Sequence, residues 1–224
     1  MTKTNGLGIF RAGMCAVVAL AALGCSAAPV DENVGSSQAE LKKPDPRLAA
    51  SQETYFRSAF GDMTLGTDAF GNTVDKNIVM MPTPQTSGDG TPGSIDVTLG
   101  AGEGFTVPFF VELGTSYRDG TPPDPFEPLS LFTTLDIKVT LDGKTLITTD
   151  NVLSYFSKFT FEPPIPFDDA VIQAIIWYEG VALLQNPLPP GKHVMTLDER
   201  NAEPGFGGIL EFHNTWNLTV EPAR

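Results

Sequence analysis

The feature that most constrains the fold is a series of short stretches in which apolar and polar residues alternate. Each stretch ends at a turn rich in Gly and Pro. The clearest case is 135–141 (LDIKVTL), in which Leu, Ile, Val and Leu share one face of an extended chain. Asp142-Gly143 follows, and a second short stretch, 144–147, comes directly after it. A strand, an Asp-Gly pair and another strand predict a β-hairpin.

The same reasoning predicts further strands, at 94–99, 105–113, 155–161, 192–197 and 211–220. Pro108 places the second of these at a sheet edge, a strand start or a bulge, because proline cannot donate to a ladder. Gly and Pro are frequent, at 22 and 19 of 224 residues. We expect an all-β fold, an antiparallel β-sandwich (Ig-like or jelly-roll-like) of about 7–9 strands with one short helix. A closed barrel is the alternative.

Three stretches between these strands lack a clear strand pattern. Residues 81–93 and 114–128 are loops, since both consist largely of turn residues and the second holds four prolines. Residues 167–185 are ambiguous, and we expect a short helical turn near 169–174, followed by a buried strand from about Ile175.

The N-terminus has the pattern of a signal peptide. Lys3 and Arg11 precede the apolar run 12–23, which is too short to span a bilayer as a helix, because that needs about 20 residues. Gly24-Cys25 ends the run and resembles the lipobox of bacterial lipoproteins. The resemblance implies cleavage after Gly24 and lipidation, including palmitate, at Cys25. Ser26 in place of Asp implies sorting to the outer membrane. An ordinary secretory signal cut near residues 27–28 is the alternative.

These features divide the chain into three parts. Residues 1–24 are the signal peptide, and residues 25–52 are the lipidated Cys25 and a flexible tether, because they are poor in large apolar side chains. A coil of this length reaches roughly 30 Å. Residues 53–224 are expected to form a single β-sandwich domain, long enough to fold on its core alone.

Charge and cysteine content exclude several classes of function. Without residues 1–24 the chain keeps 12 basic and 27 acidic residues, a net charge of −15, which repels nucleic acids and anionic lipid surfaces. The membrane contact is therefore expected through the lipid anchor. Cys15 leaves with the signal and Cys25 carries the lipid, so the domain has no disulfide, thiolate metal site or cysteine nucleophile.

A second resemblance covers residues 95–220. The segments 177–193, with its PLPPGKH turn, and 216–220 (WNLTV) resemble a group of uncharacterised bacterial secreted proteins. That group implies an all-β fold and no particular activity. The Pro-Pro-Gly turn itself is a tight corner, because two residues of fixed φ precede one that can take positive φ.

The sequence gives little support for catalysis. No nucleophile elbow or phosphate-binding loop is present. Of the two histidines, His193 is expected to be half-buried and bonded to a backbone carbonyl, and His213 to be exposed on the polar face of the last strand. A metal site using both is a minor alternative.

The remaining candidates are carboxylates and aromatic rings in loops. Asp198, Glu199 and Glu203 form a candidate calcium site, although the main expectation is no cofactor. Tyr117 and Phe126 lie in the proline-rich loop and are candidate ligand-binding residues, for a glycan or an envelope protein. Packing over the end of the sandwich is the structural alternative for both rings.

We therefore expect a lipid-anchored cell-envelope protein that acts as a non-enzymatic binding or interaction module. Two alternatives remain open: a carboxylate-dependent, carbohydrate-active hydrolase, and a structural subunit of an envelope complex.

Overall fold

The structure, a computed structural model, describes residues 45–85, 87–201 and 209–223. Within these ranges the elements in chain order are α1 (Pro46–Ala59), β1 (Gly66–Thr67), β2 (Thr73–Asp75), β3 (Ile78–Met80), β4 (Gly93–Leu99), β5 (Gly104–Tyr117), α2 (Ser130–Thr133), β6 (Asp136–Leu141), β7 (Lys144–Thr148), the 3-10 helix η1 (Thr149–Tyr155), β8 (Phe156–Pro166), β9 (Ile172–Gln185), β10 (Gly191–Asn201) and β11 (Leu210–Val220).

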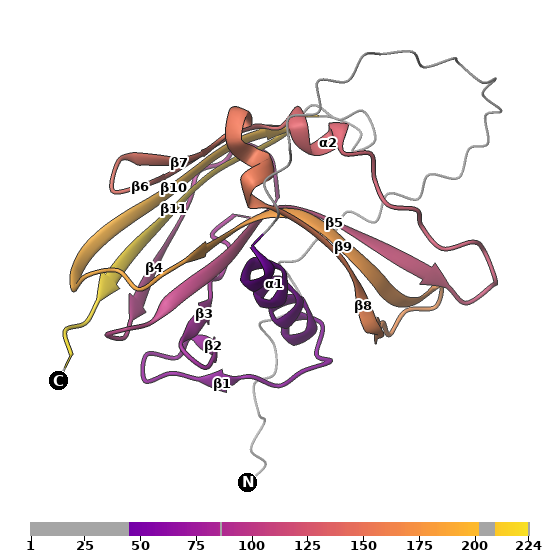
Figure 1. Ribbon diagram of the computed structural model, residues 1–224, viewed down its shortest axis with the longest axis horizontal. Helices are drawn as coiled ribbons and strands as arrows, with labels where there is room; N and C mark the ends of the chain where they lie inside the picture. Colours follow the sequence, from indigo (N-terminus) through magenta and orange to yellow (C-terminus); the bar gives the residue numbers. More distant parts are fainter. Residues whose placement is uncertain (1–44, 86, 202–208, 224) are drawn as a thin grey trace, which may run out of the picture.

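The strands form two sheets, shown in Figure 1. The six-stranded sheet has the order β1-β2-β3-β5-β9-β8, and the five-stranded sheet has the order β4-β11-β10-β6-β7. Most pairings are antiparallel, but β4 runs parallel to β11 and β3 runs parallel to β5. The predicted all-β sandwich is confirmed, with two parallel pairings that the sequence did not indicate.

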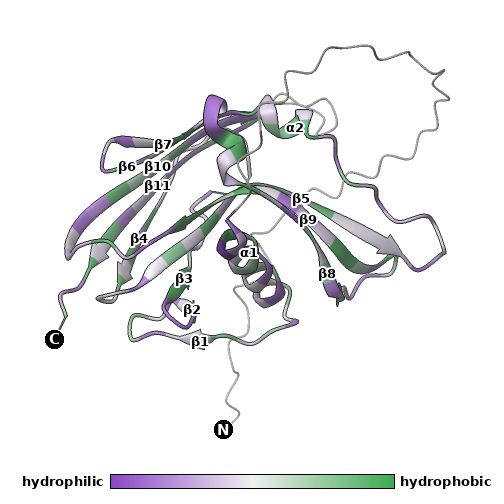
Figure 2. Cartoon of the chain, viewed as in Figure 1, coloured by the Kyte–Doolittle hydropathy of each residue, from purple (hydrophilic) through white to green (hydrophobic). Residues whose placement is uncertain are grey.

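The main core lies between the two sheets. Strands carry alternating hydrophobic and hydrophilic residues, as Figure 2 shows, and the hydrophobic ones face inward. The predicted face of 135–141 is buried, and Trp216 and Leu218 of β11 are buried with it. The predicted hairpin also forms, with Asp142 at φ 51° and Gly143 at φ 75° in the turn between β6 and β7.

Helix α1 corrects the predicted domain boundary. It begins at Pro46, so residues 46–52 belong to the folded domain and not to the tether. Asp45 caps the helix by accepting a hydrogen bond from the Arg47 backbone N–H at 2.9 Å. Its buried face includes Leu48 and Phe56, and Phe56 packs with residues of β8 and β9 on the outer face of the six-stranded sheet.

Two further expectations need correction. The structure has no helical turn at 169–174, because the Asp169 carboxylate accepts hydrogen bonds from the backbone N–H groups of Val171 and Ile172, and β9 begins there. The described residues hold eleven strands, more than the expected 7–9, because β1, β2 and β3 are strands of only two or three residues. Pro108 lies at a bulge of β5, as predicted.

Candidate functional site

The proline-rich segment between β5 and α2, residues 118–129, covers the end of the six-stranded sheet, and we call it the strap. It leaves β5 and returns over the sheet to α2 (Figure 1). Asp124 fastens it. Its Oδ2 accepts hydrogen bonds from the Thr115 backbone N–H at 2.9 Å and from the Thr115 hydroxyl at 2.7 Å, and its Oδ1 accepts one from the Tyr117 hydroxyl at 2.7 Å.

A tryptophan forms the floor beneath the strap. Trp177 of β9 donates from Nε1 to the Asp124 carbonyl at 2.8 Å, and the Phe126 ring packs on it with centroids 4.9 Å apart. Trp177 is paired with Gly114 of β5, and a Cβ at Gly114 would lie 1.8 Å from the Trp177 Cε2 atom. Only glycine at 114 leaves room for the indole to lie across β5, so these two residues together make the floor.

A buried ion pair fixes the strap at a second point. Glu179 of β9 is 1% exposed in its side chain, and its Oε1 lies 2.6 Å from Lys158 Nζ on β8. Its Oε2 accepts the Glu127 backbone N–H at 2.9 Å. The Lys158 amine also lies 3.8 Å from the centroid of the Phe126 ring, a cation–π geometry.

The carboxylates of Asp124, in the strap, and of Glu179, beneath it, are therefore both used to attach the strap. Each oxygen of Asp124 and of Glu179 has a protein partner in the contacts above. A general acid or base needs an oxygen that can reach a substrate proton. These two carboxylates therefore hold the strap in place, which is a structural role.

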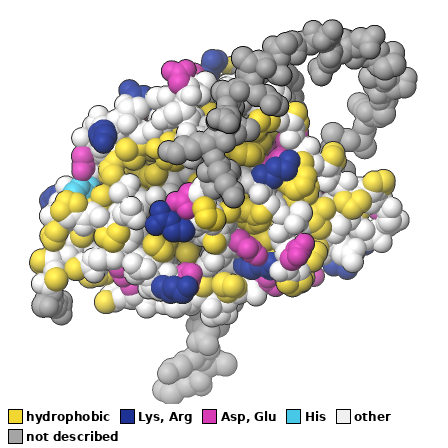
Figure 3. Space-filling model, in the orientation of Figure 1, with side chains coloured by type: hydrophobic (Ala, Val, Ile, Leu, Met, Phe, Trp, Pro, Cys, Tyr) yellow, Lys and Arg dark blue, Asp and Glu magenta, His cyan; other side chains and the backbone are white. Residues whose placement is uncertain are grey.

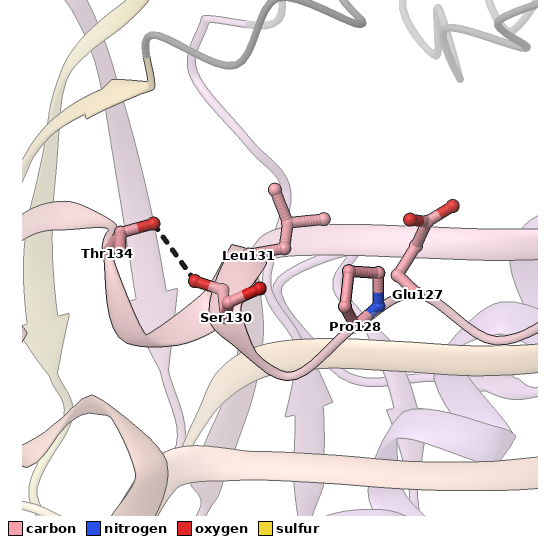
Figure 4. Close-up of a pocket in the computed structure, with 5 residues that line it drawn as sticks. All are labelled: Glu127, Pro128, Ser130, Leu131 and Thr134. Carbon is pink, nitrogen blue, oxygen red and sulfur yellow. Dashed lines mark hydrogen bonds between the residues drawn. The ribbon is translucent and has the colours of Figure 1, made fainter. Parts of the chain in front are cut away.

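Beside the strap lies an open pocket of about 270 Å³. Figure 4 shows its lining residues, which come from the end of the strap and from α2: Glu127, Pro128, Ser130, Leu131 and Thr134. The Thr134 hydroxyl donates to the Ser130 carbonyl at 3.0 Å. Hydrophobic side chains gather on the face seen in Figure 3, with single charged residues between them. Phe126 and Leu129 are exposed hydrophobic residues of the strap, at 36% and 39%.

The two aromatic residues singled out in the sequence come together in this site. Tyr117 ends β5 and its hydroxyl holds Asp124, whereas Phe126 packs on Trp177 and keeps about a third of its surface exposed. The structure thus gives both rings a role in attaching the strap. Phe126 also remains available to a ligand at its exposed surface.

The predicted calcium cluster is not brought together. Asp198 and Glu199 are adjacent on β10, so their side chains lie on opposite faces of the five-stranded sheet. Asp198 is exposed and contacts His213, with 3.0 Å between Oδ1 and Nδ1, while Glu199 is 3% exposed. Glu203 lies outside the described residues. Among those that are described, no group of three or more His, Cys, Asp or Glu side chains is placed to hold a metal ion.

The histidines take the structural positions that were expected. His193 Nε2 lies 2.8 Å from the Pro189 carbonyl and Nδ1 lies 2.7 Å from Asp142 Oδ2. The hydrogen bond to Asp142, followed by the one to Pro189, raises the pKa of His193 above its usual value. This contact ties the PLPPGKH turn to the β6–β7 turn. His213 is exposed on β11, as predicted.

The predicted processing and lipidation sites, Gly24 and Cys25, lie outside the described residues. Of the helices in the described ranges, none is long and apolar enough to cross a membrane.

Sequence reasoning missed the residues that hold the strap: Gly114, Asp124, Lys158, Trp177 and Glu179. Their partners are far away in the chain, as with Trp177 and Asp124, which are 53 residues apart. The one available signal was an acid at 179 within a stretch of apolar residues, because a carboxylate in a buried strand must be paired.

Comparisons with known proteins add no family assignment. No family model matches the chain. No curated protein matches it either. One solved structure, described as "Structure of PbICP-C in complex with falcipain-2", is similar at 9% identity over 65% of this chain and 99% of that one, with a TM-score of 0.25. A score this low supports no inference about fold or function.

Proposed function

We propose that this protein is a lipid-anchored, non-enzymatic interaction module of the cell envelope, which binds a partner protein through the strap. The observation that carries the proposal is the strap itself. It is an exposed, proline-rich segment with Phe126 and Leu129 at its surface, held by Asp124 and Glu179 instead of being left loose.

Holding the loop in place matters for affinity. A flexible loop loses conformational freedom when it binds, at about 0.5–1.5 kcal/mol for each side chain that becomes ordered. The contacts of Asp124, Trp177 and Glu179 already order the strap in the unbound domain, so it has less conformational freedom to lose on binding. Prolines in the strap restrict its backbone further. Rigid loops with exposed aromatic residues on a β scaffold are typical of binding surfaces.

The chemistry of the surface indicates the kind of partner. Exposed apolar groups favour a protein contact with an apolar centre. The mature chain would carry a net charge of −15, so a neutral or basic partner is favoured over an acidic one. The anchor is supported by the Gly24-Cys25 pattern after an apolar run, and it would confine the domain to partners at the same membrane.

Photo-crosslinking in intact cells tests the binding surface. A photoreactive amino acid replaces Leu129 in the strap, and in a matched control it replaces Val194, an exposed apolar residue of β10 at 43% exposure against 39%. We expect a defined protein adduct from position 129 and none from position 194. Equal or absent crosslinking at the two positions would refute the strap as the binding surface. An adduct removed by glycosidases would assign the site to a glycan instead.

A further inference from the structure

The strap carries its prolines close together, in the stretch 122–128, as Pro122, Pro123, Pro125 and Pro128. Proline fixes φ at about −65°, and the residue before a proline is pushed out of the helical region toward an extended or polyproline II backbone. Asp124 and Glu127 each precede a proline, so Phe126 is the one residue of this stretch that neither constraint limits. The sequence therefore favours polyproline II geometry over nearly the whole stretch.

The attachment of the strap has the period of that geometry. A polyproline II helix has about three residues per turn, so residues three apart point the same way. The Asp124 N–H donates to the Thr115 carbonyl at 3.0 Å, and the Glu127 N–H donates to Glu179 Oε2 at 2.9 Å. These two N–H groups, three residues apart, both face the six-stranded sheet. No backbone hydrogen bond in the described structure joins two residues of 120–127, which is also typical of polyproline II.

The other two sides of the strap carry its apolar residues. Pro123, Phe126 and Leu129 share one side, where the Phe126 ring also packs on Trp177. The remaining side consists of prolines alone, and we call it the proline ridge: Pro122, Pro125 and Pro128. All three ridge residues are exposed. In polyproline II geometry, successive ridge prolines lie about 9 Å apart and the ridge is about 19 Å long.

The ridge also presents hydrogen-bond acceptors. The Asp124 carbonyl accepts from Trp177 Nε1 at 2.8 Å, on the side of the sheet. The carbonyls of Pro122 and Pro125 have no partner in the contacts between described residues. A polyproline II backbone has no internal hydrogen bonds, so such carbonyls can accept from donors of a bound protein. The strap therefore combines a rigid apolar ridge with acceptors along it.

We propose that the proline ridge docks, as a preformed polyproline II ligand, into a groove lined by aromatic side chains on the partner protein. This inference rests on the proposed function and names the kind of partner that the strap binds. Aromatic-lined grooves take proline-rich segments because these segments are already ordered and lose little entropy on binding. Asp119 and Glu127 place acidic groups beside the ridge, so we expect basic residues at the rim of the groove.

Crosslinking from position 129 in isolated cell envelopes tests the ridge. We expect a synthetic poly-L-proline peptide to reduce the protein adduct roughly fivefold or more, because it competes for the groove, and a Gly-Ser peptide of the same length to leave it unchanged. The double variant Pro122→Ala/Pro125→Ala should lose adduct to a similar extent. Pro190→Ala is the matched control, since Pro190 is an exposed proline beyond the opposite end of β9, and it should crosslink like the wild type.

The outcomes separate this inference from the proposed function. An adduct that persists with poly-L-proline and in the double variant would overturn the ridge inference and leave the strap as the binding surface. Absence of any adduct in the wild type would overturn both. The poly-L-proline arm uses the wild-type strap, so it decides the question if a shifted tryptophan emission shows that the double variant has lost the contact of Phe126 with Trp177.

Discussion

Lys158 Nζ lies 2.6 Å from Oε1 of Glu179, and the same amine lies over the ring of Phe126. One lysine therefore neutralises a buried carboxylate and contacts the strap that covers it. The other Glu179 oxygen holds the strap backbone through the Glu127 N–H. The ion pair and the position of the strap are therefore coupled. A change in the ion pair should alter how the strap is held, and displacement of the strap should weaken the ion pair.

Removing the lysine should cost more than neutralising the glutamate. Lys158→Met leaves the buried Glu179 charge unpaired, and we expect a loss of about 2 kcal/mol in the free energy of unfolding, less than for a fully buried pair because Lys158 is 44% exposed. Glu179→Gln keeps an acceptor for the Glu127 N–H and should cost less. Urea unfolding measures both, with Lys144→Met as an exposed control. A larger loss in Glu179→Gln would contradict this account of the pair.

Gly114 should be sensitive to the smallest enlargement. Gly114→Ala drives a methyl group into Trp177, so we expect a loss of about 2 kcal/mol or more in the free energy of unfolding. Trp177 fluorescence should shift as the indole is displaced. Gly66→Ala is the control, because a Cβ there meets its nearest atom at 3.8 Å. Equal stability of the two variants would show that the indole does not lie across Gly114.

The contact of His193 with Asp142 should make stability depend on pH. The pKa of His193 is raised, so the folded state holds the proton more tightly than the unfolded state. The contribution is fully present below about pH 6.5 and is lost as the pH rises through the folded-state pKa. We expect the difference in unfolding free energy between wild type and His193→Gln to shrink over that range. A difference that is constant with pH would rule out a charged His193 in the folded state.

Glu199 should destabilise the fold increasingly as the pH rises. Its pKa is raised to about 8 by burial, so the folded state keeps a proton that the unfolded state loses above about pH 4.5. Glu199→Gln should be more stable than wild type at pH 8, by up to roughly 4 kcal/mol, and by much less at pH 5. Thermal unfolding at the two pH values measures this. A gain that does not grow with pH would show that Glu199 is not buried uncharged.

The features that could be predicted from sequence are local ones. Strand alternation at 135–141 and the Asp142-Gly143 turn depend on neighbouring residues, and the structure confirms both. The strand predicted at 192–197 in fact continues to Asn201, and the same period of two places the carboxylates of Asp198 and Glu199 on opposite faces. Helix α1 also had a local signal, Asp45 followed by Pro46, which the polar composition of the preceding residues obscured.

The strap could not be found in this way. Its attachment depends on contacts between β5, β8, β9 and a loop, and no pattern within any one of these segments identifies the others. Gly114 shows the difficulty well, because its need for glycine comes from Trp177, a residue on another strand. The same holds for the buried Asn214, whose side-chain amide donates to the carbonyl of Gln85, 129 residues away in the chain.

We propose that this interaction module is held at a membrane through Cys25, where its strap meets a partner fixed to the same surface. Intact-mass measurement of the protein purified from cell envelopes tests it most directly, together with sequencing of its N-terminal peptide. We predict a chain that begins at Cys25 and carries the added mass of a diacylglycerol and a third fatty acid. An unmodified chain that begins beyond Cys25 would contradict the claim.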